Sequence, residues 1–155
     1  MLLTFAFLSC TLFALSTADF LVRRLPDFLT GGLIAAGLVR TAWVDGGQGT
    51  LGTAAAGLVG FATLWAIARL YIQLRGHRGL GRGDAKLLAA AGAWMGPTYL
   101  APIVFVGAVL ALLYVLGLRI VGRAITAVAV VPFGPFLSAA FFGFWCLKVS
   151  GWLVL

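Results

Sequence analysis

The sequence has few charged residues and no glutamate. Charged side chains make up 10% of its 155 residues, and its acids are four aspartates. Soluble domains carry about 25% charged residues, so this chain has too few to cover a surface that faces water. Hydrophobic residues account for 63%, and the mean hydropathy is +1.11. The composition excludes a soluble domain and predicts an integral membrane protein.

Cysteine and histidine are also scarce. Cys10 and Cys146 lie in separate apolar segments, and no CxxC pair is present. This spacing does not suit a zinc site or a disulfide framework, so we expect both residues to be buried, unreactive thiols. We predict no metal and no cofactor.

Segments of strictly alternating polarity, which are typical of membrane β-barrels, are missing as well. Long runs of Leu, Ala, Val, Gly and Phe favour helices, which satisfy their own backbone hydrogen bonds in lipid. We predict an all-α fold, a polytopic transmembrane helical bundle in contact with membrane lipid. No internal repeat is visible, so residues 1–155 are expected to form a single membrane-embedded domain. The six expected spans are 1–18, 28–44, 51–74, 84–96, 99–118 and 127–154.

The basic residues give the chain a net charge of +7 and indicate its orientation. Most of them lie in or beside every second connection between spans, which the positive-inside rule assigns to the cytoplasm. Both termini are then outside a bacterial plasma membrane, and Arg40 and Lys148 lie toward the outer side. No soluble basic surface remains for nucleic acid. The residues assigned to the cytoplasmic side are Arg23, Arg24, Arg69, Arg75, Arg78, Arg82, Lys86, Arg119 and Arg123.

The four aspartates fall into different settings. Asp45 lies in the turn VDGGQGT, and Asp27 follows Pro26 at the start of the second span, where an acid suits the helix dipole. Asp19 and Asp84 are separated by two complete spans, so both belong to the same membrane face. The fourth segment is only about 18 Å long against a hydrocarbon layer of about 30 Å, which places Asp84 below the surface.

An ionised acid inside a membrane bundle needs a partner, and Asp19 is the natural partner of Asp84. Two neighbouring carboxyl groups repel when both are charged, so the pair can retain one proton. One acid can then activate water while the other protonates a carbonyl or a leaving group. The pair is therefore a candidate for hydrolytic chemistry.

Simpler explanations stay open on these residues alone. Asp84 would serve as a helix cap, and Asp19 as an interfacial acid neutralised by Arg23 or Arg24. A proton- or ion-coupled carrier would use the same two acids as a relay, although no repeat typical of such carriers is visible. A structural assembly subunit is a further alternative.

Three segments resemble one known family. GRGDAKLLAAAGAWMG, residues 81–96, resembles the GxGD signature of the type IV prepilin peptidases, which are membrane aspartic proteases. ADFLVRRLPDFLT, residues 18–30, is similar to the region of that family's first catalytic acid. VPFGPFL, residues 131–137, resembles the segment that opens the family's last span. The matches occur in family order and extend over essentially the whole chain.

The resemblance implies an endopeptidase that cuts the basic leader from type IV prepilin or pseudopilin precursors, in a pilus or type II secretion system, at the cytoplasmic membrane face. It assigns Asp19 and Asp84 as the catalytic dyad, with Gly81 and Gly83 as a flexible loop that admits peptide backbone. The positions that match framing residues of the family are Arg24, Pro26 and Lys86. Pro132, Gly134 and Pro135 are expected to kink the last helix.

Two departures from the family pattern stand out. Asp27 occupies a position where the family usually has asparagine, which adds an acid near the site. Long members also carry an N-terminal cytoplasmic extension with paired CxxC motifs and N-methyltransferase activity. Residues 1–155 contain no CxxC motif. We therefore expect the short form, with cleavage but without methylation or zinc.

Overall fold

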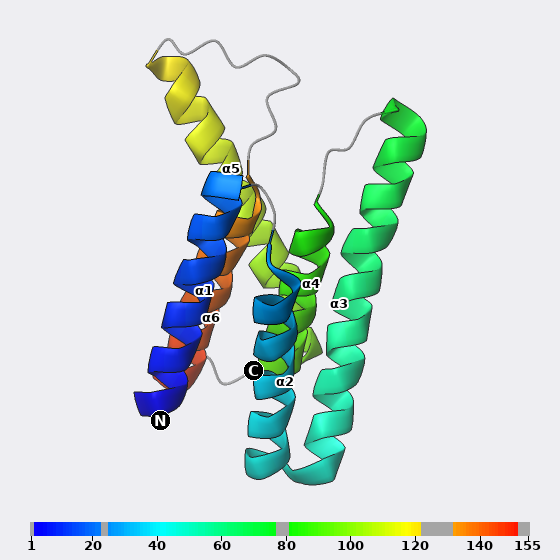
Figure 1. Ribbon diagram of the computed structural model, residues 1–155, viewed down its shortest axis with the longest axis vertical. Helices are drawn as coiled ribbons and strands as arrows, with labels where there is room; N and C mark the ends of the chain where they lie inside the picture. The colour runs from blue at the N-terminus through cyan, green and yellow to red at the C-terminus, as the bar shows by residue number, and fades with distance from the viewer. Residues whose placement is uncertain (1, 23–24, 77–80, 122–131, 152–155) are drawn as a thin grey trace.

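The computed structural model describes residues 2–22, 25–76, 81–121 and 132–151, whose arrangement is shown in Figure 1. This part of the chain is helical and contains no strand, which confirms the all-α prediction. Helices that are consecutive in the sequence run in alternating directions along one bundle. The elements are α1 (Leu2–Val22), α2 (Asp27–Val44), α3 (Gly46–Arg75), α4 (Arg82–Met95), the 3-10 turn η1 (Pro97–Tyr99), α5 (Leu100–Ile120) and α6 (Gly134–Val149).

The outer surface of the bundle is suited to lipid. Three described stretches are long and apolar enough to cross a membrane, namely Leu3–Val22, Gly46–Arg75 and Pro97–Ile120, and α6 is a shorter apolar helix. Large apolar side chains such as Phe13 and Phe105 are mostly exposed on these helices. An apolar exterior of this kind is stable in lipid and not in water, so the chain is a multi-pass membrane protein.

Several helix boundaries differ from the sequence prediction. α3 begins at Gly46 instead of residue 51, so most of the expected turn VDGGQGT is helical. α1 continues to Val22 instead of ending at residue 18, so Asp19 lies within its last turn. The apolar residues that follow Asp19 allow the helix to continue past a single charge. α6 begins at Gly134, with Pro135 in its first turn, a position that tolerates proline because it needs no N–H partner. The Pro–Gly segment therefore starts this helix instead of kinking it; residues 127–131 of the predicted span lie outside the described ranges.

α4 forms the centre of the bundle. From Asp84 to Met95 it is buried at every residue except Lys86, and it packs against α2, α3 and α6. Its length of about 21 Å is less than the hydrocarbon thickness, so longer helices have to surround it. Trp94 connects its own helix, α4, to α2 and α6. Its indole N–H donates to Leu33 O in α2 at 2.8 Å, and its ring packs edge-on against that of Trp145 in α6.

The end of the bundle opposite to Asp19 carries Arg40 and Lys148. The Arg40 guanidinium lies over the Trp145 ring, 4.5 Å from its centroid. Lys148 Nζ donates to Met95 O at 3.2 Å, near the last turn of α4. This placement agrees with the expected separation of these two basic residues from the others.

Glycine allows α3 and α4 to approach each other closely. A Cβ atom at Gly92 would lie 2.6 Å from both Ala56 C and Gly57 N, which are backbone atoms of α3. A Cβ atom at Gly57 would in turn lie 3.0 Å from Ala89 O. Small residues at helix contacts in membranes bring backbones together in this way, and here they hold the central helix in place.

The packing at Gly92 predicts the effect of a single methyl group. Gly92→Ala would force the α3 and α4 backbones apart and lower the free energy of unfolding by about 1–3 kcal/mol. The thermal unfolding midpoint of the protein purified in detergent measures this loss. Gly32→Ala is the control, because no other described residue has an atom within 4 Å of its Cβ position. Equal midpoints for the two variants would contradict the packing argument.

Candidate active site

Asp19 and Asp84 lie at the same end of the bundle, where α1 ends and α4 begins (Figure 1). Both carboxylic acids are buried, with exposed fractions of 6% and 5%. Two intervening helices return the chain to this end, so the structure agrees with the placement expected from counting spans. Burial of two acids in one apolar region requires polar partners for both of them.

Gly134 brings the two acids together. Its backbone N–H donates to Asp19 Oδ2 at 3.1 Å, across 115 positions of the sequence. A Cβ atom on Gly134 would lie 2.7 Å from Asp19 Oδ2 and 3.4 Å from Asp84 Oδ1. Both carboxylates therefore face the same small space beside the first turn of α6, close enough to repel each other when charged. A side chain at this position would occupy that space.

Gly81 fixes the second acid. Its backbone N–H donates to Asp84 Oδ2 at 3.2 Å, which is a capping contact from the third residue of α4 to the residue before the helix. Asp84 thus has the capping role that the sequence left open, and it also faces Asp19. The two roles use different carboxylate oxygens, because Oδ1 is the one near the Gly134 position.

The two glycines before Asp84 lie in different settings, and their expected role as a loop that admits peptide backbone stays a prediction. Gly83 lies inside the first turn of α4, and Gly81 has a φ of −79°, which any residue can adopt. A Cβ atom at Gly83 would lie 2.5 Å from Leu25 Cδ1. Close packing against Leu25, and not a positive φ, is the reason for glycine at this position.

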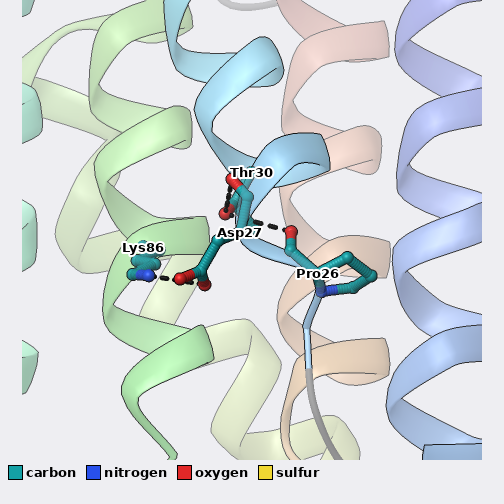
Figure 2. Close-up of polar contacts among 4 residues, drawn as sticks. All are labelled: Pro26, Asp27, Thr30 and Lys86. Carbon is teal, nitrogen blue, oxygen red and sulfur yellow. Dashed lines mark hydrogen bonds and ion pairs between the residues drawn. The ribbon is translucent and has the colours of Figure 1, made fainter.

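Lys86 and Asp27 form an ion pair that joins α4 to α2 near the two acids (Figure 2). Lys86 Nζ donates to Asp27 Oδ1 at 2.6 Å. Asp27 is the first residue of α2, as predicted for a helix-start acid, and Pro26 precedes it. The Thr30 hydroxyl donates to Asp27 O at 3.1 Å and Pro26 O at 3.4 Å, which closes the first turn. These contacts hold the first turn of α2 and attach it to α4, while the supporting role expected for Lys86 and Pro26 stays a prediction.

The remaining predicted residues have mixed outcomes. Arg24 lies outside the described residues. Asp45 follows the last residue of α2 and is exposed, as expected for a turn. Cys10 is exposed on α1, so the prediction of a buried thiol is wrong for it, while Cys146 is partly buried. Apolar neighbours in the sequence could not reveal which face of the helix points outward.

Sequence reasoning missed the contact between Gly134 and Asp19. Its only signal was the combination of proline and glycine in VPFGPFL, which we interpreted as a kink. A glycine such as Gly134, between Pro132 and Pro135, has no side chain and equally allows a side chain from another helix to approach the backbone. The partner could not be identified from the segment itself.

Two adjacent carboxylic acids of this kind can carry out general acid–base catalysis. A pair that shares one proton contains a base and an acid at the same time, so one group can deprotonate water while the other protonates a carbonyl oxygen. The backbone N–H groups of Gly134 and Gly81 hold one oxygen of each acid in a fixed direction. The geometry is suited to hydrolysis of a carbonyl compound such as a peptide.

Comparison with known proteins gives a consistent result. The model of the type IV leader peptidase family matches residues 6–116. A protein from Xanthomonas campestris pv. campestris is 36% identical over 151 residues, covering 95% of this chain and 47% of that protein. A protein from Neisseria gonorrhoeae is 35% identical over 149 residues, covering 95% of this chain and 46% of that protein.

A protein from Burkholderia pseudomallei is 40% identical over 143 residues, covering 85% of this chain and 42% of that protein. All three relatives are named prepilin leader peptidase/N-methyltransferase. The chain spans about half the length of these relatives. No solved structure matches the chain significantly.

The exposure of the ion pair predicts how much it stabilises the fold. Lys86 and Asp27 have side-chain exposures of 33% and 80%. Solvent screening at such a site limits the coupling energy between the two groups to about 1 kcal/mol or less. A double-mutant cycle of Asp27→Asn, Lys86→Met and the double variant, followed by chemical unfolding, measures this energy. A coupling of about 3 kcal/mol or more would instead indicate a desolvated pair.

Proposed function

The chain belongs to the type IV leader peptidase family, and on this premise we propose that it is an aspartic endopeptidase. The proposed reaction is removal of the basic leader from type IV prepilin or pseudopilin precursors. The observation that carries the proposal is the convergence of Asp19 and Asp84, both buried, on the backbone of Gly134. The names of its relatives include a leader peptidase activity, which agrees with this chemistry.

The proposed mechanism uses the two acids in complementary states. The ionised acid takes a proton from a water molecule, and the water oxygen attacks the carbonyl carbon of the scissile peptide bond. The protonated acid donates its proton to the carbonyl oxygen, giving a tetrahedral intermediate. When the carbon–nitrogen bond breaks, one carboxyl group protonates the leaving amine, and the other carboxylate accepts a proton from a hydroxyl of the intermediate as the new carboxyl group forms. The pair then holds one proton again, ready for another cycle.

The position of the pair suits a substrate that spans the membrane. The acids lie where α1 ends and α4 begins, and the basic segments of the sequence favour the cytoplasm for this end. A precursor with a basic leader in the cytoplasm and an apolar helix in the bilayer would present its scissile bond at that depth. A carrier function has less support, because both acids lie at one end of the bundle and not at its midplane.

Conservative replacement of each acid tests the proposal. Asp19→Asn and Asp84→Asn should each slow cleavage of a co-expressed precursor by at least about 100-fold, because an amide cannot exchange the proton. Gel separation of the precursor and its product measures the rate, and the yield of detergent-purified protein reports folding. Asp45→Asn, at an exposed turn, should cleave at the normal rate. Normal cleavage by either dyad variant would overturn the proposal.

The space beside Gly134 gives a second test. Gly134→Ala would place a methyl group 2.7 Å from Asp19 Oδ2, so one carboxylate must move, and we expect a loss of at least about tenfold in kcat. Gly143→Ala on the same helix is the matched control, since its Cβ position has no neighbour within 4 Å in the part of the chain that the structure describes. Insertion in the membrane should be normal for both. Equal kcat values for the two variants would show that this space is not needed.

A further inference from the structure

A groove between α1 and α6 begins beside the two acids. Its volume is about 460 Å³. Ser16 and Pro135 line the groove; Ser16 lies one helical turn before Asp19, and Pro135 directly follows Gly134. From there the lining extends along α1 to Ser9 and along α6 to Phe142, away from the acid end. α1 and α6 lie side by side in Figure 1, so the groove follows the long axis of the bundle.

The walls of the groove combine apolar surface with polar atoms. Phe13 is 72% exposed and Ala139 is exposed, so both are open to whatever lies alongside. Ser9 is satisfied within its own helix, because its hydroxyl donates to Ala6 O at 3.0 Å.

Ser138 is different from Ser9. It is 3% exposed, and its Oγ has no hydrogen-bond partner among the residues that the structure describes. Buried hydroxyl groups are normally paired, and serines within membrane bundles often pair across helices. The Ser138 Oγ is itself enclosed by the protein, so this hydroxyl lies inside the wall and the surface that the groove offers is largely apolar.

We propose that this groove seats one face of the apolar membrane helix of the precursor, because the groove begins beside the two acids and its walls are largely apolar. The inference rests on the proposed function and assigns a binding site to its substrate. The leader would lie on the cytoplasmic side, the scissile bond at Asp19 and Asp84, and the helix beyond it along α1 and α6. This direction is the one that the groove takes from the acid end.

Native Cys10 makes the occupant testable, because it lines the groove and is exposed. The enzyme would carry Cys146→Ser and Asp84→Asn, the latter to prevent turnover, and the precursor would carry single cysteines scanned along its apolar helix. We expect copper-catalysed disulfides with Cys10 at positions three to four residues apart, on one face of the precursor helix. The control retains Cys146, which is outside the groove lining, and carries Cys10→Ser; it should form none of these disulfides.

Filling the groove gives a kinetic test. Ala139→Phe should raise KM for the full-length precursor by at least about fivefold with a smaller change in kcat, the pattern for lost substrate binding. Ala108→Phe, at an exposed site on α5, should leave both values unchanged.

The outcomes separate this inference from the function on which it rests. If Cys10 forms disulfides only with a second copy of the enzyme, or with no cysteine of the precursor helix, the groove holds another occupant and the inference is overturned. The same holds if Ala139→Phe has the KM of the unmodified enzyme. In these cases the endopeptidase function stands as long as Asp19→Asn and Asp84→Asn are inactive. Cleavage by those variants would overturn the function itself.

Discussion

Burial of two carboxylic acids in one apolar bundle is the constraint on which this structure depends. Asp19 and Asp84 are both at least nine-tenths buried, and their charges repel. Removing such groups from water is unfavourable unless hydrogen bonds replace part of the lost hydration. Each acid accepts a backbone N–H, from Gly134 for Asp19 and from Gly81 for Asp84. Asp19 therefore holds the start of α6 by a hydrogen bond, and Asp84 holds the start of α4 in the same way.

The same constraint explains the position of the central helix. α4 is too short to cross the membrane alone, so its first turn lies within the bundle and is surrounded by longer helices. Gly92 lets it approach α3, and the Lys86–Asp27 ion pair attaches it to α2 on a more exposed side. The meeting of α6 with α1 at Asp19 also leaves a groove between these two helices. The geometry of the proposed catalytic pair and the proposed binding surface have one structural origin.

Much of this arrangement could be predicted from the sequence, because apolar runs and charges follow simple rules in a membrane. Counting spans placed Asp19 and Asp84 at one end, and the position of Asp27 after Pro26 predicted a helix start. The contact of Gly134 with Asp19 could not be predicted, since it joins residues 115 positions apart through packing of whole helices. The exposure of Cys10 was missed for a related reason: an apolar helix does not show in its sequence which face contacts lipid.

The central claim is that Asp19 and Asp84 act as one site, and metal bridging measures this directly. A protein with Asp19→Cys and Asp84→Cys, in a background of Cys10→Ser and Cys146→Ser, would place two thiols around Gly134. The account predicts that the double variant binds Cd²⁺ at least about 100-fold more tightly than either single variant, because two thiolates can share one soft ion only when they are adjacent. Equal affinity for the double and single variants would contradict it.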